Sequence, residues 1–447
     1  MSITGSEAIT SRKKPAIPDS PAPPRPATDR KRGTFASLKV RNYRLFFGGQ
    51  IISNVGTWMQ RIAQDWLVFE LSGYNPVALG VAVALQFVPT LLLSLWAGVL
   101  ADRVDKRRLL MAIQTGVALQ ALALGALVLG GAAQLWQVYA LAFVLGTLSA
   151  LEVPTRQAFV SEMVGRDQAA NAVALNSSIF NLARIVGPAI AGFVIVLVGT
   201  GWLFVANAVS TVAVIAGLAL MNPAELFRAP AVARAKGQLR EGLRYVRGRP
   251  DLMTVMVLVF FVSTFGITFF TSLAIVSANV FGTEADGYGM LSTLLAVGTF
   301  TGALAAARRG SRGRPSLKVL LTSAAALGAI EFVGAFMPTY LTFGLALVPL
   351  GFATITFLNT ANALVQTTVS PQMRGRVMGL YVLVLMGGNP LGGPMTGWLA
   401  EVFGGRSPFY VGGGVALVAA LVCGYFAYRA RQGNDSAQTL VHRMRLG

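Results

Sequence analysis

A stripe of polar side chains interrupts the otherwise apolar stretch 44–71. Its members recur at steps of three and four residues and are Gln50, Asn54, Thr57, Gln60, Arg61 and Gln64. In an α-helix these steps place the side chains on one face, and in lipid such a face must be turned toward protein or toward a water-filled cavity. All but Gln50 are our candidate substrate-binding residues. The alternative interpretation is that the same side chains hydrogen-bond neighbouring helices together.

Asp65 is a carboxylate in the same stretch, about 20 residues and ~30 Å from the start of the helix, which puts it in the outer part of a membrane. An ionised carboxylate is expensive there, and a site that takes a proton from outside and releases it inside needs such a group. Two alternatives remain. Arg61, four residues earlier on the same helix, could neutralise Asp65 permanently, or Asp65 could be hydrated at the outer rim of the membrane. Glu331, in the stretch 316–336, is a second candidate for proton coupling or another rim residue.

Arg184 lies about 13 residues, or ~20 Å, into the stretch 171–199. A buried guanidinium needs hydrogen-bond acceptors. Arg184 could bind an anionic or catecholate-like substrate, or pair with Asp65 and switch as protons come and go. It could equally form a structural ion pair or clamp backbone carbonyls. We retain it among the candidate substrate-binding residues.

Helix-breaking residues occur at two places in the apolar stretches. Gly187, Pro188 and Gly192 form the first group, and the run GGNPLGGP (387–394), with Pro390 and Pro394, forms the second. Proline removes one backbone hydrogen bond and bends a helix, and glycine permits close helix contact. These residues are candidate hinges for alternating access, although Gly and Pro are also common in ordinary membrane helices. For 387–394 we expect a flexible element.

The elements that would position these residues are twelve apolar stretches, each long enough to cross a ~30 Å hydrocarbon core. They lie near 44–71, 77–101, 108–130, 135–154, 171–199, 202–221, 252–281, 287–307, 316–336, 340–369, 374–403 and 409–429. Of the 37 Lys and Arg, 34 lie in the tails and in alternate connections. This asymmetry is typical of a polytopic membrane protein and predicts that both termini are cytoplasmic.

Composition excludes several classes of function. The chain is 54% hydrophobic and 12% charged, against roughly 25% charged residues in soluble domains. The net charge of +19 resides in short loops, which suits lipid head groups better than nucleic acid. The lone cysteine, Cys423, excludes an internal disulfide or a cysteine-cluster metal site, and the lone histidine, His442, lies in the tail. Without a P-loop or a Ser-His-Asp set, we expect no enzyme, no cofactor and no metal.

The chain divides into two sets of six stretches. We expect a disordered cytoplasmic tail (1–36), an N-terminal six-helix bundle (37–221), a cytoplasmic linker (222–251), a C-terminal six-helix bundle (252–430) and a disordered cytoplasmic tail (431–447). Asp102-Arg103 is matched by Arg308-Arg309, and Gly187-Pro188 by Gly393-Pro394, both at an offset of 206 residues. A parallel six-plus-six repeat is the organisation of a secondary transporter whose site lies between the halves.

Several segments resemble a known family. GVLADRVDKRR (98–108) resembles the loop signature of the major facilitator superfamily, and NSSIFNLARIVGPAIAG (176–192) resembles the fifth-helix motif of its drug:proton antiporters. The segments beginning NYRLFFGGQ (42), EVPTRQAFV (152) and PQMRGRVMGLY (371) resemble the enterobactin-exporter-like branch. The resemblance covers residues 36 to 430.

The resemblance implies the major facilitator fold, an all-α polytopic membrane protein with twelve transmembrane helices in two pseudo-repeat bundles. It also implies a cytoplasmic latch between helices that holds the outward-open state. The matching residues here are Asp102, Arg103, Arg107, Glu152 and Arg156. In the alternative interpretation the basic members only enforce topology.

We therefore expect a monomeric transporter of the cytoplasmic membrane that exports an amphipathic small molecule, a siderophore-like metabolite or a drug, in exchange for protons. One alternative is an importer or facilitated-diffusion carrier of the same fold. The other is a non-transporting membrane receptor or scaffold.

Overall fold

The computed structural model describes residues 35–165, 167–227, 238–310 and 315–446, and within these ranges all regular structure is helical. After a short 3₁₀ turn, six long helices follow one another. They are α1 (Arg41–Ser72), α2 (Pro76–Arg103), α3 (Lys106–Leu129), α4 (Leu135–Val164), α5 (Ala169–Val198) and α6 (Thr200–Ala219). Helix α7 (Gln238–Arg247) precedes the second half of the chain.

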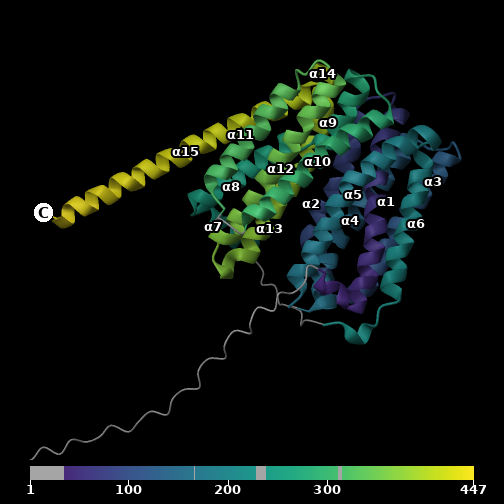
Figure 1. Ribbon diagram of the computed structural model, residues 1–447, viewed down its shortest axis with the longest axis horizontal. Helices are drawn as coiled ribbons and strands as arrows, with labels where there is room; N and C mark the ends of the chain where they lie inside the picture. The colour runs from purple at the N-terminus through teal and green to yellow at the C-terminus, as the bar shows by residue number, and fades with distance from the viewer. Residues whose placement is uncertain (1–34, 166, 228–237, 311–314, 447) are drawn as a thin grey trace, which may run out of the picture.

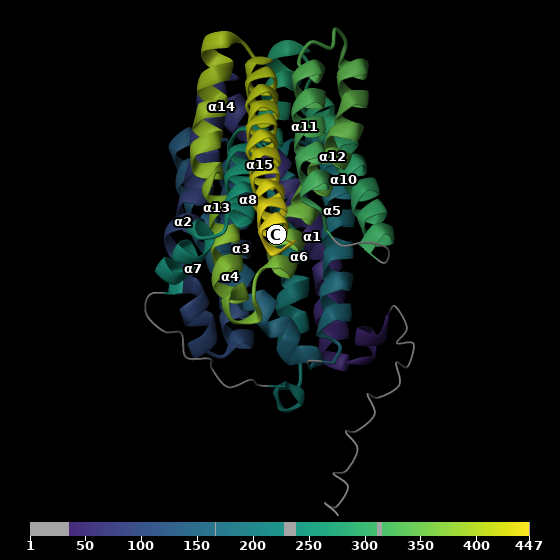
Figure 2. The same ribbon diagram turned by 90° about the vertical axis from the view of Figure 1, so that its left-hand side faces the viewer.

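The second half begins with a broken helix, α8 (Pro250–Phe261) and α9 (Phe269–Ile275), each followed by a π-helical turn, η3 (Val262–Gly266) and η4 (Val276–Val280). The remaining helices are α10 (Ala285–Gly310), α11 (Leu317–Gly334), α12 (Tyr340–Thr368), α13 (Pro371–Gly387), α14 (Asn389–Phe403) and α15 (Ser407–Leu446). Figure 1 shows α1–α6 as one group of helices and α8–α15 as a second group beside it, and in Figure 2 the second group lies in front of the first.

Local sequence fixes where these helices start and stop. Asn75 precedes Pro76, and its side chain accepts hydrogen bonds from the amides of Val77 and Ala78, as a helix N-cap does. The side chain of Asp105 caps α3 in the same way, by accepting a hydrogen bond from the backbone amide of Arg108. Gly73 ends α1 in the left-handed conformation with φ 67°, which glycine adopts without steric cost. Adjacent helices are thereby joined by short turns.

The protein is a multi-pass membrane protein. Eleven helical segments of the described residues are long and apolar enough to cross a membrane. Helix α1 is not among them, because its polar stripe lowers its mean hydropathy. It is nevertheless 32 residues long and packs closely on α6, where a Cβ added to Gly49 or Gly217 would lie 2.8 Å from a backbone carbonyl of the partner helix. The count of twelve spans therefore stays a prediction.

The helices run alternately between two ends of the molecule. The end where α1 begins also carries the α2–α3 and α4–α5 connections and helix α7, and we call it the basic end. We call the other end, which carries the α1–α2, α5–α6 and η4–α10 connections, the opposite end. The segment between Ala219 and Pro250 includes α7, whose helical character the sequence GQLREGLRYVRGRP predicts, and Arg376 Nη1 holds it to α13 through a 2.7 Å ion pair with Glu241.

The two halves meet closely at the opposite end. A Cβ added to Gly80 of α2 would lie 2.6 Å from the carbonyl oxygen of Gly393 in α14. One added to Gly289 of α10 would lie 2.6 Å from the carbonyl oxygen of Pro188 in α5. The Asn279 amide also donates a 3.2 Å hydrogen bond to the carbonyl oxygen of Tyr74. Glycine at these positions lets the backbones approach, so the two halves are joined at this end.

Three features differ from simple continuous spans. The stretch 374–403 is divided into α13 and α14 at Gly388, inside the predicted breaker run. The stretch 252–281 is interrupted by π-helical turns, which the sequence did not predict. The sequence predicts a disordered tail over 431–447, whereas α15 is helical as far as Leu446. The predicted tail 1–36 lies almost wholly outside the described residues.

Candidate functional site

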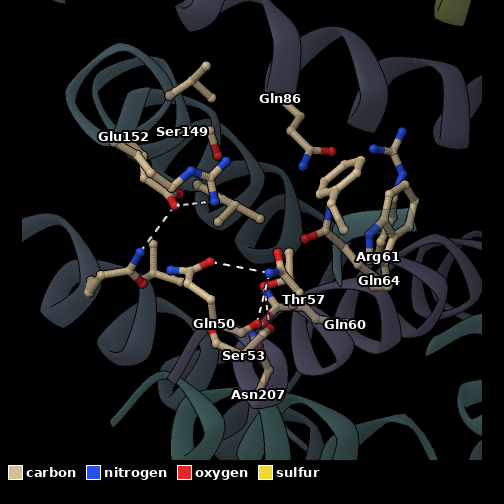
Figure 3. A pocket seen from close by; sticks show the side chains of 18 of the residues that line it. Gln50, Ser53, Thr57, Gln60, Arg61, Gln64, Gln86, Ser149, Glu152 and Asn207 are labelled. Atoms are coloured by element: carbon tan, nitrogen blue, oxygen red, sulfur yellow. Dashed lines mark hydrogen bonds and ion pairs between the residues drawn. The ribbon is translucent and has the colours of Figure 1, made fainter. Parts of the chain in front are cut away.

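A cavity of ≈ 340 Å³ lies within the first half, and every residue that lines it belongs to α1–α6. Its volume is within the range of small-molecule sites. One wall is the polar face of α1, and the facing walls carry Gln86 of α2, Gln114 of α3 and Glu152 of α4. Figure 3 shows the labelled side chains surrounding a common space, with Ser149 and Glu152 across from Arg61 and Gln64. Through Gln114 and Arg156 the cavity extends toward the basic end.

The five candidate binding residues of α1 all line this cavity, but they are not equivalent. Among the described residues, the side chains of Asn54 and Thr57 hydrogen-bond within their own helix, to Gln50 and to the Ser53 carbonyl. Gln60 is buried and lies in an amide chain, donating to Gln120 and accepting from Asn207. For Gln60, the helix-bridging interpretation therefore accounts for its contacts. Gln64 is buried, and its Oε1 atom has no hydrogen-bond partner.

Asp65 lies at the contact between the two halves. It is 5% exposed, and its Oδ2 accepts a 2.9 Å hydrogen bond from the Tyr288 hydroxyl of α10. Neither Arg61 nor Arg184 is within ion-pair distance of Asp65, so neither permanent pairing with Arg61 nor exchange with Arg184 is seen in this state. Asp65 follows Arg61 by one helical turn, and it therefore lies between the cavity and the contact that closes the opposite end.

Arg61 and Arg184 share an aromatic frame. The Arg61 guanidinium carbon is 4.8 Å from the centroid of the Phe270 ring and 5.9 Å from that of Trp58. The Arg184 carbon is 5.8 Å from each of the same two rings. These distances are typical of cation–π contacts. The structure therefore brings together two cations predicted on separate helices, and Phe270 joins them from the second half. Arg61 lines the cavity, whereas Arg184 is not among the lining residues and adjoins the cavity through the shared ring of Trp58.

Glu331 is separate from the cavity. It is 3% exposed in α11, in a niche that two glycines leave open. A Cβ on Gly266 would lie 3.3 Å from its Oε2 atom, and one on Gly412 would lie 3.0 Å from Oε1. Oε2 has no hydrogen-bond partner. The carboxyl group thus packs against the π-helical turn η3 and is not a rim residue.

The predicted hinge residues lie at close helix contacts. A Cβ on Gly187 would lie 2.5 Å from the Trp58 Cβ atom. Gly192 lies against Ala285 and Gly289 of α10. Pro390 stands in the first turn of α14, next to the break, and Pro394 lies within that helix.

The hydrogen bonds and ion pairs of the predicted latch residues, as far as the structure describes these residues, lie within the first half. Glu152 pairs with Arg156 on α4 at 3.2 Å and accepts from Gln114. Arg107 instead donates to the carbonyl oxygens of Leu218 and Ala219 at the end of α6, at 2.6 and 2.7 Å. Next to Arg107 in the chain, Lys106 forms a 2.8 Å ion pair with Glu162. Arg103 is exposed, and the side chain of Asp102 lies outside the described part.

Sequence reasoning missed the aromatic members of the site and Tyr288. Trp58 follows Asn54 by four residues and precedes Arg61 by three, so its position on the polar face was a signal that could have found it. No such signal marks Phe270 or Tyr288, because their roles arise from contacts between helices more than 200 residues apart in the chain.

Comparison with known proteins agrees with this architecture. Residues 32–445 match the family model described as transmembrane secretion effector. The staphyloferrin A transporter of Staphylococcus aureus is 25% identical over 81% of this chain and 90% of its own length. The multidrug efflux pump Tap of Mycolicibacterium fortuitum is 28% identical over 80% and 89%. The enterobactin exporter EntS of Shigella flexneri is 23% identical over 80% and 85%.

Solved structures share the fold. One is a bacterial homologue of the human lysosomal transporter Spinster, which matches with a TM-score of 0.63 and 16% identity over 88% of this chain and 97% of that one. The family match spans nearly the whole chain, and the relatives are transporters of the major facilitator superfamily and not enzymes. The chain is therefore a member of the transmembrane secretion effector family of the major facilitator superfamily.

Proposed function

We propose that this protein exports an amphipathic small molecule, a siderophore-like metabolite or a drug, across the cytoplasmic membrane in exchange for protons. The observation that carries the proposal is the position of Asp65. This carboxylate lies between a polar cavity that extends toward the basic end and the contact that closes the opposite end. A group at that position can link its own protonation to opening and closing.

The positive-inside rule assigns the basic end to the cytoplasm, so both termini are cytoplasmic and the cavity in this state accepts its cargo from inside. Names of the relatives support this direction, because two of them are described as an exporter and an efflux pump. The cavity lies within one chain, and a monomer is therefore sufficient for transport.

The transport cycle follows from these positions. Cargo enters from the cytoplasm and binds the polar face of α1 together with Arg184. When the opposite end opens, the Asp65–Tyr288 hydrogen bond breaks, cargo leaves and a proton binds Asp65 from outside. After closure, the proton leaves Asp65 through the cavity past Gln64 and Arg61. Glu331 is a second protonation site, because its buried carboxyl group packs on the π-helical turn of a helix that must move.

Two further groups of residues act in the same cycle. Gly187, Pro188 and Gly192 let α5 bend against α1 and α10, and Pro390 and Pro394 do so for α13 and α14. The cluster at the basic end, with Asp102, Arg103, Arg107, Glu152 and Arg156, forms a latch between helices that holds the outward-open state. Charge pairs that form in one state and break in the other are an established switching device.

The test compares small molecules in the medium and inside cells of wild type, a deletion strain and an Asp65→Asn strain, each with and without iron. The amide keeps the size of the side chain and can still accept a hydrogen bond from Tyr288, but it cannot take up and release a proton as a carboxylate does. We expect one compound to be lost from both mutant media and to accumulate inside the cells. Glu401→Gln, which changes an exposed carboxylate outside the cavity, is the matched control and should export normally.

Other outcomes separate the parts of the proposal. Normal export by Asp65→Asn, at equal protein level, would remove Asp65 from proton coupling while leaving the exporter in place. If the deletion changes no compound in any medium but lowers uptake of an external compound, the carrier is an importer.

A further inference from the structure

We infer that the cargo carries an anionic group of the carboxylate class, and that Arg61 and Arg184 bind it together. The inference rests on the proposed function, because it identifies the ligand of that cavity. Its first support is the arrangement of the two guanidinium groups. They come from different helices, α1 and α5, and both lie over the rings of Trp58 and Phe270.

The second support is the charge balance of this cluster. Among the described residues, Asp65 lies one helical turn from Arg61 and its Oδ2 atom accepts from Tyr288, while Glu152, the carboxylate that lines the cavity, is paired with Arg156. Within the described residues, neither arginine forms a salt bridge or donates a hydrogen bond, and the Nε atom of each is buried without a partner. Two cations beside one carboxylate leave one positive charge uncompensated inside the membrane. An anion that enters the cavity would neutralise it and satisfy the free donors.

The third support is the aromatic frame, which holds the guanidinium groups in place. Trp58 packs on Phe180 and Phe270 with ring centroids 5.5 and 5.3 Å away. Gly187 leaves room for the Trp58 Cβ atom, so α5 can bring Arg184 against the same indole. Rings that stack on the flat faces of a guanidinium leave its N–H edges for an acceptor.

The surrounding cavity completes the description of the ligand. Trp58, Phe87 and Phe180 offer apolar surface beside Arg61. The unpartnered Oε1 atom of Gln64 offers an acceptor to a hydroxyl or amide of the ligand. The fitting molecule is thus an amphiphile with a carboxylate, an apolar or aromatic body and a hydrogen-bond donor. A cationic amphiphile of the same size would be repelled by the two guanidinium groups.

The test measures binding to the purified full chain in lipid nanodiscs, without any ion gradient, at pH 7.5. Three probes share one aromatic body and differ in the head group: 2-naphthoate, 2-naphthamide and 2-naphthylmethylammonium. Quenching of tryptophan fluorescence reports binding. We expect wild type to bind the anion at least tenfold more tightly than the amide, and the cation most weakly.

Arg61→Gln and Arg184→Gln should each reduce the preference for the anion about tenfold, as loss of a charge-assisted hydrogen bond does. Arg61→Lys should restore much of the preference, because it keeps the charge. Arg374→Gln, at an exposed arginine of the basic end outside the cavity, is the matched control and should behave as wild type. Size-exclusion chromatography and circular dichroism confirm that each variant is folded.

Equal binding of the three probes, no detectable binding of naphthoate, or an unchanged preference in both glutamine variants would each overturn the inference. These results would leave export itself untouched, since they do not depend on a gradient. Conversely, a clear anion preference in a protein whose deletion changes no exported compound would keep the anion site and overturn the proposed direction.

Discussion

Tyr288 donates the hydrogen bond that links Asp65 to the second half, and Tyr288→Phe removes only this hydroxyl group. A hydrogen bond to a carboxylate contributes about 1.5–3 kcal/mol, so the ratio of open to closed opposite ends should rise about tenfold or more. Spin labels on Cys residues placed at Tyr74 and Asn279, which meet at this end, would report the change as a longer distance population.

Tyr139→Phe is the control for this experiment. Its hydroxyl donates a 3.0 Å hydrogen bond to the Ala78 carbonyl within the first half, so its loss should not change the distance between the halves. If Tyr288→Phe and Tyr139→Phe give the same distance distribution as wild type, the Asp65–Tyr288 bond does not control closure.

Gln60 tests whether a residue of the polar stripe holds helices together. Gln60→Leu would leave the amides of Gln120 and Asn207 without their partner in a buried position, which costs about 1–3 kcal/mol for each unsatisfied group. We expect a clearly lower thermal unfolding midpoint in detergent. Thr57→Val should change the midpoint little, because Thr57 is exposed to the cavity and bonds only to its own helix. Equal midpoints for both variants would contradict the bridging role.

At this scale, the sequence predicts which residues face the interior but not what they touch. Helical periodicity alone places Asn54 and Gln64 on one face, and the structure finds both at the cavity. It cannot distinguish Gln64 from Gln60, whose contacts depend on Gln120 and Asn207 of other helices. The meeting of Arg61 with Arg184 was equally unpredictable, because it depends on how α5 packs on α1 through Gly187.

Two equivalent contacts between helices close the opposite end. Gly80 of α2 lies against Gly393 of α14, and Gly289 of α10 lies against Pro188 of α5. The repeat that relates Gly187-Pro188 to Gly393-Pro394 also relates the two contacts helix by helix, because α2 corresponds to α10 and α5 to α14, although the contacting residues themselves are not at the 206-residue offset. The sequence repeat was predictable, and its structural consequence is a closure built on both sides of the molecule.

Gly80→Val should therefore prevent full closure, because even a Cβ would lie 2.6 Å from the Gly393 carbonyl oxygen. We expect a shift toward the outward-open state and slower export at an unchanged amount of folded protein. The spin-label distance at Tyr74 and Asn279 checks the shift. Gly48→Val is the matched control, because nothing lies within 4 Å of a Cβ at that position; a normal distance in Gly80→Val would disprove the role of this contact.

The two broken helices differ in how well the sequence predicts them. The break between α13 and α14 falls within GGNPLGGP, where glycine and proline weaken the helix locally. The π-helical turn η3 contains Gly266 but no proline. Its geometry arises from packing, since Glu331 of α11 and Gly412 of α15 press on this turn. Breaks caused by local sequence are predictable from the chain, and breaks caused by neighbouring helices are not.

For the whole molecule, the asymmetry of charge predicts orientation, while hydropathy alone leaves the number of spans at eleven. Helix α1 is the exception, because the polar face that makes it a cavity wall also lowers its mean hydropathy, although the sequence predicts a span over the stretch 44–71. Its length of 32 residues, or about 48 Å at 1.5 Å per residue, is ample for crossing. We therefore predict that α1 crosses the membrane and that the total is twelve.

Cysteine accessibility in intact cells tests this topology. The lone Cys423 is buried and can be replaced by serine. Single cysteines at Tyr74, Gly131 and Thr339 of the opposite end should react with a membrane-impermeant maleimide, whereas cysteines at Arg41, Asp105 and Lys318 should react only after permeabilisation. The pair at Arg41 and Tyr74 decides the count: reaction of both from the same side would mean that α1 does not cross. Reaction of the three basic-end positions from outside would reverse the orientation, and the cavity would then open to the exterior and favour import.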